Sequence, residues 1–178
     1  VHLINVGNEA VQVNFMEAYA RGEPTPPQSN IDAFVRYARD LVSLGDVDAV
    51  LITCSTMNRS YPQVQEALDP LGVPVVQIDR PMMDRAVRHG GRTLVVATHG
   101  PTVRSTQALL QETAEDLGAS GDLAGLTVES AWDRLAAGDV QGHNDALAAA
   151  IRERLREETV ASVVLAQLSM TVFLLSYP

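Results

Sequence analysis

The chain has 178 residues, enough for one ordinary domain or two small ones, and 46% of them are hydrophobic. Thirteen Lys and Arg residues against twenty-two Asp and Glu residues give a net charge of −9, which disfavours binding to nucleic acids or anionic membranes. A single cysteine excludes an internal disulfide, and no apolar run reaches the roughly 18 residues of a membrane helix, so we expect a cytoplasmic globular protein.

Strand-like apolar runs alternate with helical patterns along the chain, which predicts an α/β protein with parallel sheets. Residues 1–6 read as a strand already under way, so we expect a leading strand before them. A helix is predicted from an N-cap at Asn30 to Gly45, which would close it. Further strands are predicted at 47–53, 73–78, 93–98 and 160–166, with a short one at 126–128, and further helices at 62–71, 82–89, 103–117, 130–137 and 145–158.

The only cysteine, Cys54, follows the predicted strand at 47–53, at the place where open α/β sheets bind ligands. Two hydroxyl side chains, Ser55 and Thr56, come next, and the start of a helix there would aim backbone N–H groups at a bound carboxylate. A thiol beside a carboxylate can carry a proton to or from the neighbouring carbon. The alternative is that Cys54 is only a small buried side chain, as unpaired cysteines usually are.

An internal repeat organises the chain into two halves. Residues 47–57 align without gaps on residues 160–170, which places Gln167 opposite Cys54 and Ser169 opposite Thr56. We therefore predict two similar α/β halves, whose facing strand ends would enclose one small polar cleft. The first half, residues 1–88, carries Cys54; the second, residues 89–172, carries Gln167; residues 173–178 would begin a segment that returns to the first half.

Five segments resemble the aspartate/glutamate/hydantoin racemase superfamily, and together they span nearly the whole chain. The resemblance implies two pseudo-symmetric, doubly wound, Rossmann-like parallel-sheet domains with the site between them. It also implies epimerisation of a carbon next to a carboxylate without a cofactor, usually by two cysteines, one from each half, on opposite sides of the substrate. The segments are DAVLITCST around Cys54, VPVVQIDRPM at 73–82, GRTLVVATHGPTVRSTQALL at 91–110, AWDRLAAGD at 131–139 and SVVLAQLSM at 162–170.

One departure from the family pattern concerns the chemistry directly. The first family cysteine maps onto Cys54, but the second maps onto Gln167, whose amide is neither a useful base nor a useful acid. The nearest hydroxyl is that of Ser169, which has no visible activating partner. Three functions stay open: an amino-acid racemase-type isomerase with Cys54 as acid/base, a single-cysteine decarboxylase like the arylmalonate decarboxylase of the same superfamily, and a catalytically reduced protein that binds a small acid.

A turn with two threonines follows the predicted strand at 93–98. Thr98 and Thr102 resemble the turn with which the family grips a substrate carboxylate, and we expect both to contact the substrate, although Thr102 could equally cap a helix. Between them, His99 is expected to be a solvated loop histidine.

Other classes of site are not indicated. The four histidines lack metal-ligand spacing, and no complete glycine-rich dinucleotide loop occurs, so neither a metal nor a cofactor is predicted. The expected partners are a small carboxylate-bearing substrate and further copies of the chain in a homo-oligomer, with a dimer as the reasonable guess.

Overall fold

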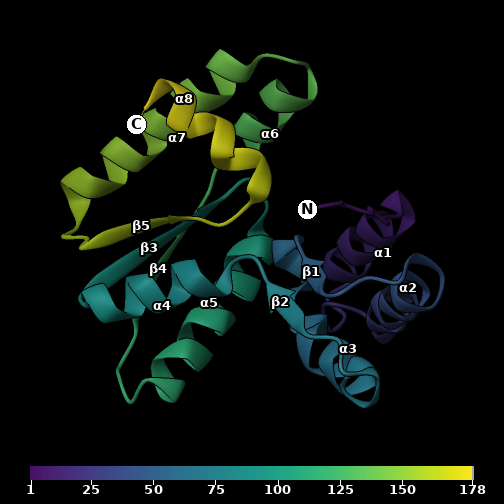
Figure 1. Ribbon diagram of the computed structural model, residues 1–178. Coiled ribbons are helices and arrows are strands. Elements are labelled where there is room, and N and C mark those ends of the chain that lie inside the picture. The colour runs from purple at the N-terminus through teal and green to yellow at the C-terminus, as the bar shows by residue number, and fades with distance from the viewer. Residues whose placement is uncertain (178) are drawn as a thin grey trace. The chain divides into compact units, whose positions relative to one another are not determined.

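The computed structural model describes residues 1–177, which fold into two compact units (Figure 1). The first unit ends at Ile78 and the second begins at Asp79. The boundary falls here rather than at residue 88, because the helix α4 (Arg80–His89) packs against α5 (Gly100–Asp116) and β5 (Ser162–Leu165) of the second unit.

The first unit is built on a two-stranded parallel sheet, in which β1 (Val50–Ile52) pairs with β2 (Val75–Gln77). Along both strands, buried and exposed side chains alternate, which is the pattern of a sheet with one covered face. The remaining elements of this unit are the α-helices α1 (Glu9–Ala20), α2 (Gln28–Gly45) and α3 (Tyr61–Leu68) and the short 3-10 helices η1 (Ser55–Ser60) and η2 (Asp69–Leu71).

The core of the first unit joins the sheet to α2 and α3. Ile52 of β1 packs in one cluster with Val64 and Leu68 of α3 and Ala38 of α2, and all four are buried. Leu51, on the opposite face of β1, keeps 52% of its surface exposed. The two helices therefore cover one face of this sheet.

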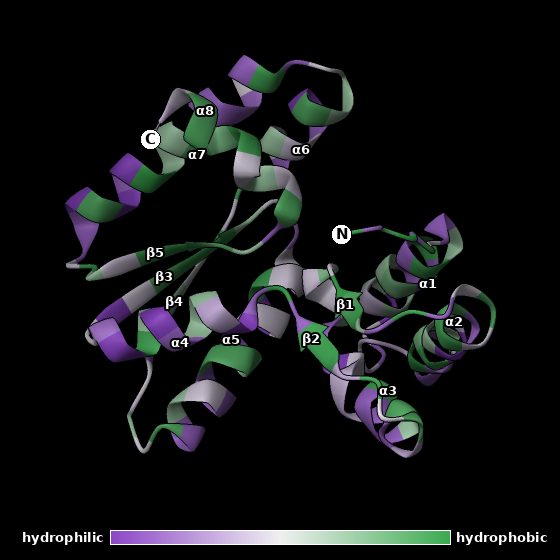
Figure 2. Cartoon of the chain, viewed as in Figure 1, coloured by the Kyte–Doolittle hydropathy of each residue, from purple (hydrophilic) through white to green (hydrophobic). Residues whose placement is uncertain are grey.

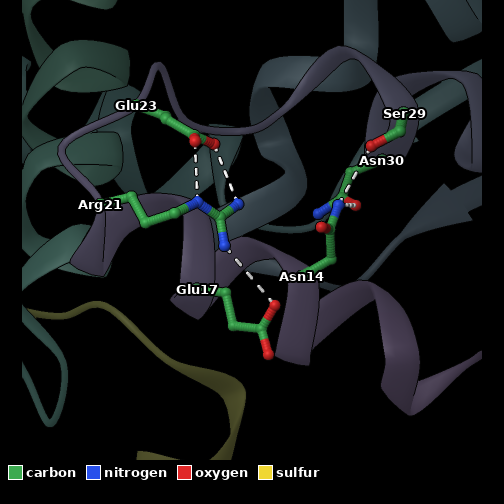
Figure 3. Close-up of polar contacts among 6 residues, drawn as sticks. All are labelled: Asn14, Glu17, Arg21, Glu23, Ser29 and Asn30. Carbon is green, nitrogen blue, oxygen red and sulfur yellow. Dashed lines mark hydrogen bonds and ion pairs between the residues drawn. The ribbon is translucent and has the colours of Figure 1, made fainter.

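Side-chain amides connect α1 to α2 (Figure 3). Asn30 of α2, which is only 2% exposed, donates from Nδ2 to the carbonyl oxygen of Val11 at 2.9 Å. Its Oδ1 accepts a hydrogen bond from Nδ2 of Asn14 at 2.7 Å. Where α1 ends, the exposed guanidinium of Arg21 forms two hydrogen bonds to the carboxylate of Glu23, at 2.7 and 3.0 Å. Exposed pairs stabilise little, whereas buried amides must stay paired, so Asn30 matters more for stability.

The second unit contains a three-stranded parallel sheet with β3 (Arg92–Ala97) in the centre, between β4 (Asp122–Thr127) and β5. Residues 94–97 of β3 are fully buried, as expected of a central strand with both faces covered. Figure 2 shows hydrophobic residues along β3 and β5. The remaining elements of this unit are α6 (Glu129–Ala136), α7 (Val140–Glu157), α8 (Phe173–Ser176) and the 3-10 helix η3 (Leu168–Val172).

Alternate side chains of β3 enter two separate cores. Val95 and Ala97 pack against α4 and α5, while Leu94 and Val96 pack against α6 and α7. Successive side chains of a strand point to opposite faces, so the second unit is a three-layer α/β/α arrangement.

The structure confirms most of the elements predicted from the sequence. The apolar runs at 47–53, 73–78 and 160–166 contain β1, β2 and β5, and the run at 93–98 overlaps β3, which begins one residue earlier. The predicted helices at 62–71, 82–89, 103–117, 130–137 and 145–158 correspond to α3 with η2, α4, α5, α6 and α7, with ends shifted by up to five residues. The short strand predicted at 126–128 is longer and begins earlier, at Asp122.

Near the N-terminus the predictions were wrong. Residues 1–6 form no strand, because neither β1 nor β2 pairs with them, and Leu3 is 75% exposed. The helix α1 was not predicted; Asn8 caps it by accepting from the N–H of Ala10 at 3.0 Å. The next helix, α2, begins at Gln28 with Pro27 as its N-cap, so Asn30 lies inside it.

Near the C-terminus, α8 packs on α7 and η3 within the second unit. That residues 173–178 begin a segment returning to the first half stays a prediction. Asn144 of α7 donates from Nδ2 to the carbonyl oxygen of Val172 and to Oγ of Ser176, both at 2.9 Å, and Tyr177 donates to the Asp145 carboxylate at 2.6 Å. Residue 178 lies outside the described residues.

Candidate functional site

Cys54 lies two residues beyond β1 and directly before η1, with an extended backbone (φ −99°, ψ 111°). It is exposed, so the alternative of a small buried side chain is wrong. Its Sγ lies 3.1 Å from Oγ1 of Thr56, and either atom can be the donor. A hydroxyl in this position donates to a thiolate or accepts from a thiol, so both protonation states of Cys54 have a hydrogen-bond partner.

The 3-10 helix η1 is anchored by buried polar contacts. The N–H of Met57 donates to the carbonyl oxygen of Cys54 at 3.0 Å, and Oγ of Ser60 donates to the carbonyl oxygen of Met57 at 2.7 Å. Gln77, at the end of β2, donates from Nε2 to the carbonyl oxygen of Asn58 at 2.9 Å. The sequence analysis did not identify Gln77 as a residue that anchors η1. The one sign of this role in the sequence is that Gln77 is a polar residue within an apolar run. The half-buried Ser55 is the first residue of η1.

The same local structure follows β5 in the second unit. Gln167 is extended (φ −134°, ψ 138°) and precedes η3, just as Cys54 precedes η1. The N–H of Met170 donates to the carbonyl oxygen of Gln167 at 2.9 Å, matching the bond from Met57 to Cys54. Both methionines are buried. The internal repeat read from the sequence is therefore also a repeat of local structure, in which Cys54 and Gln167 hold equivalent backbone positions.

The side chain of Gln167 binds the turn that follows β3. Its Oε1 accepts from the backbone N–H of Thr98 at 2.6 Å and from the Thr98 hydroxyl at 2.9 Å. Because a backbone N–H can only donate, the amide atom that faces it must be the oxygen, and the NH2 group must point the other way. Both donors of Thr98 are thus occupied by Gln167. The pairing of Val96 with Leu165 in the sheet places the two residues side by side.

Thr102 lies in the first turn of α5, whose N-cap is His99, so the capping alternative for Thr102 is wrong. Its hydroxyl is buried and has no hydrogen-bond partner among residues 1–177. One turn further along the helix, the hydroxyl of Thr106 is in the same situation. Ser169, the remaining predicted site residue, is half-buried within η3.

His99 is not the solvated loop histidine expected from the sequence. It is half-buried, and its ring lies 5.0 Å from that of Trp132 in α6 at an angle of 59°. Burial lowers the pKa of His99, and the nearby carboxylates of Glu129 and Asp133 oppose this shift only in part. The sequence offered no signal for this contact, because 33 residues separate the two rings.

Among residues 1–177, no helix combines the length and apolarity that crossing a membrane requires. No group of three or more His, Cys, Asp or Glu side chains in the same residues could hold a metal ion.

Comparison with known proteins supports the resemblance noted in the sequence. The family model described as Asp/Glu/Hydantoin racemase matches residues 9–176. Among solved structures, the chain is similar to glutamate racemase isoform RacE1 from Bacillus anthracis, with a TM-score of 0.53 and 20% identity. That similarity covers 86% of this chain and 57% of the glutamate racemase chain, and it shows a shared α/β fold. No curated protein sequence gave a match. With its family model matched over nearly all of its length, this chain belongs to the Asp/Glu/hydantoin racemase family.

Proposed function

We propose that this protein is a cofactor-independent isomerase of the racemase type, which acts on a carbon α to a carboxylate and uses Cys54 to move the proton. The observation that carries the proposal is the exposed thiol at the end of β1, with the Thr56 hydroxyl 3.1 Å from its sulfur. Family membership supports the same reaction class. The proposed substrate is a small amino acid or amino-acid derivative that carries a carboxylate.

The proposed reaction begins with the Cys54 thiolate, which removes the α-proton while the electron pair of the C–H bond moves into an enolate. The thiol formed in this step then returns a proton to the same carbon. Thr56 can donate its hydroxyl hydrogen to the thiolate and accept from the thiol, so it serves both halves of the cycle. For inversion, a water molecule donates the proton to the opposite face of the enolate instead, and the Cys54 thiol then gives its proton up to solvent.

A second candidate function follows from Gln167, which occupies the position equivalent to Cys54 without a group that transfers protons. A decarboxylase needs only one proton donor. The bond between the α-carbon of a malonate and one carboxylate breaks, CO2 leaves, and the electron pair remains as an enolate. The Cys54 thiol protonates that enolate, and solvent then reprotonates the thiolate.

The test is an incubation in D2O with amino acids, hydantoins and substituted malonates, followed by NMR and chiral analysis. Exchange of the α-proton with inversion supports the isomerase, and CO2 release with one product enantiomer supports the decarboxylase. Cys54→Ser is the matched control, since it keeps a small hydroxyl side chain but loses the thiol, and either activity should fall about a thousandfold or more. Binding of these acids with neither reaction would instead indicate a small-acid binding protein.

A further inference from the structure

We infer that Gln167 is a carboxylate-binding residue that has taken the place of a proton-transfer group in the second unit. The inference rests on the proposed function, because it assigns to the repeated segment after β5 a role in holding the same class of substrate. Its starting point is that one end of this amide is fully occupied while the other end is free.

The Oε1 end of Gln167 acts as a clamp. It accepts both the N–H and the hydroxyl of Thr98, at 2.6 and 2.9 Å, and Thr98 is completely buried. These two bonds join the ends of neighbouring parallel strands, β3 and β5, and so fix the amide plane. With both of its donors used, Thr98 is left with no hydrogen to offer a carboxylate, which revises its expected role from ligand to support.

The Nε2 end of Gln167 has no hydrogen-bond partner among residues 1–177. The side chain is half-buried, and its NH2 group is not one of the sealed, unpartnered polar atoms, so it remains accessible. A second observation points to a ligand at this edge of the sheet: Thr102, 1% exposed, has a buried hydroxyl without a partner at the start of α5. Buried polar groups are normally paired, so an unpartnered hydroxyl beside a strand end is a group that a ligand can satisfy.

An amide NH2 donates hydrogen bonds and neither takes up nor releases a proton at neutral pH. It can therefore hold a carboxylate by donating hydrogen bonds, but it cannot carry a proton.

Gln167→Glu is the decisive variant because it separates the clamp from the donor. One carboxylate oxygen of Glu still accepts from Thr98, while the other replaces the NH2 group with an acceptor. Leu168→Glu is the matched control, since Leu168 is 50% exposed and the change adds the same charge one residue away without removing the donor. Gln167→Leu, which removes both ends, shows what loss of the clamp does.

Binding of malonate is measured by calorimetry at neutral pH, together with the melting temperature of each variant. We expect Gln167→Glu to melt close to the wild type but to bind malonate about tenfold to a hundredfold more weakly, with Leu168→Glu near the wild type. Equal binding by Gln167→Glu and wild type, or no binding of malonate by the wild type, overturns the inference. If the wild type catalyses neither α-proton exchange nor decarboxylation, but its malonate binding still depends on Gln167, the proposed function is refuted. The binding role of Gln167 then still stands.

Discussion

A hydroxyl 3.1 Å from the only thiol gives Cys54 a hydrogen-bond partner both as a thiol and as a thiolate. This small contact separates Cys54 from an ordinary unpaired cysteine, which is normally buried and inert. The thiol is exposed at a strand end instead, where a substrate can reach it.

Replacement of Thr56 tests that contact. Thr56→Val keeps the shape of the side chain but removes the hydroxyl, so we expect α-proton exchange to slow about tenfold, the effect of one hydrogen bond to a charged group. Thr56→Ser keeps the hydroxyl and should stay within about threefold of the wild type. The rate constants come from NMR in D2O, and equal rates for the valine and serine variants would show that the hydroxyl plays no part.

His99 predicts a pH dependence of stability. Burial lowers its pKa below the ordinary value of 6.5, so the unfolded chain binds a proton more readily than the folded protein. The contribution of neutral His99 to the free energy of unfolding is therefore fully present above pH 6.5. It is lost as the pH falls through the lower pKa of the folded state. His99→Phe keeps an aromatic ring against Trp132 but cannot titrate, so its melting temperature should fall less than that of the wild type on acidification.

Trp132 provides a direct readout of this titration, because it is the only tryptophan in the chain and its ring lies 5.0 Å from that of His99. We expect the tryptophan fluorescence of the folded protein to change with pH, with a midpoint below the ordinary histidine pKa. In His99→Phe this transition should vanish. A transition that persists in this variant would assign it to a group other than His99.

At the level of elements, α1 depends on polar contacts with α2 more than on an apolar stripe, since only Phe15 and Ala18 of α1 are buried. Asn30 supplies two of these contacts from a buried position: it donates to the carbonyl oxygen of Val11 at 2.9 Å and accepts from Asn14 at 2.7 Å. Figure 3 shows Asn30 beside Asn14. The contact between α1 and α2 therefore depends largely on the Asn30 side chain, whose oxygen and NH2 group are both hydrogen-bonded.

Asn30→Ala removes both of these hydrogen bonds from a buried position, so we expect a loss of about 2 kcal/mol in the free energy of unfolding. Ser29→Ala is the matched control at the neighbouring position. It removes one exposed hydrogen bond to Asn14 and should cost about 0.5 kcal/mol or less. Urea denaturation measures both; similar losses for the two variants would mean that burial of Asn30 adds nothing.

Residues 1–6 and helix α1 show where prediction from the sequence fails. Strands β1, β2, β3 and β5 were predictable because each is a short run of apolar, mostly β-branched residues bounded by loops. Residues 1–6 have that composition too, but no strand pairs with them, and pairing is a property of the fold rather than of the segment. With so few buried positions, α1 gives almost no helical periodicity to detect.

For the molecule as a whole, the sequence located a thiol at a strand end and an equivalent segment over a hundred residues later, and the structure gives both segments the same backbone pattern. The clamp between Gln167 and Thr98 was not predictable, because it joins residues 69 apart through neighbouring strands. The chain belongs to the Asp/Glu/hydantoin racemase family, and an amide, Gln167, stands at the position equivalent to Cys54.

The most direct test of the account is the fate of the α-hydrogen of an enantiopure amino-acid substrate in D2O. We predict that the wild-type protein incorporates deuterium at the α-carbon and that Cys54→Ser incorporates none above the uncatalysed background. Deuterium incorporation by Cys54→Ser at the wild-type rate would contradict the assignment of Cys54 as the proton-transfer group.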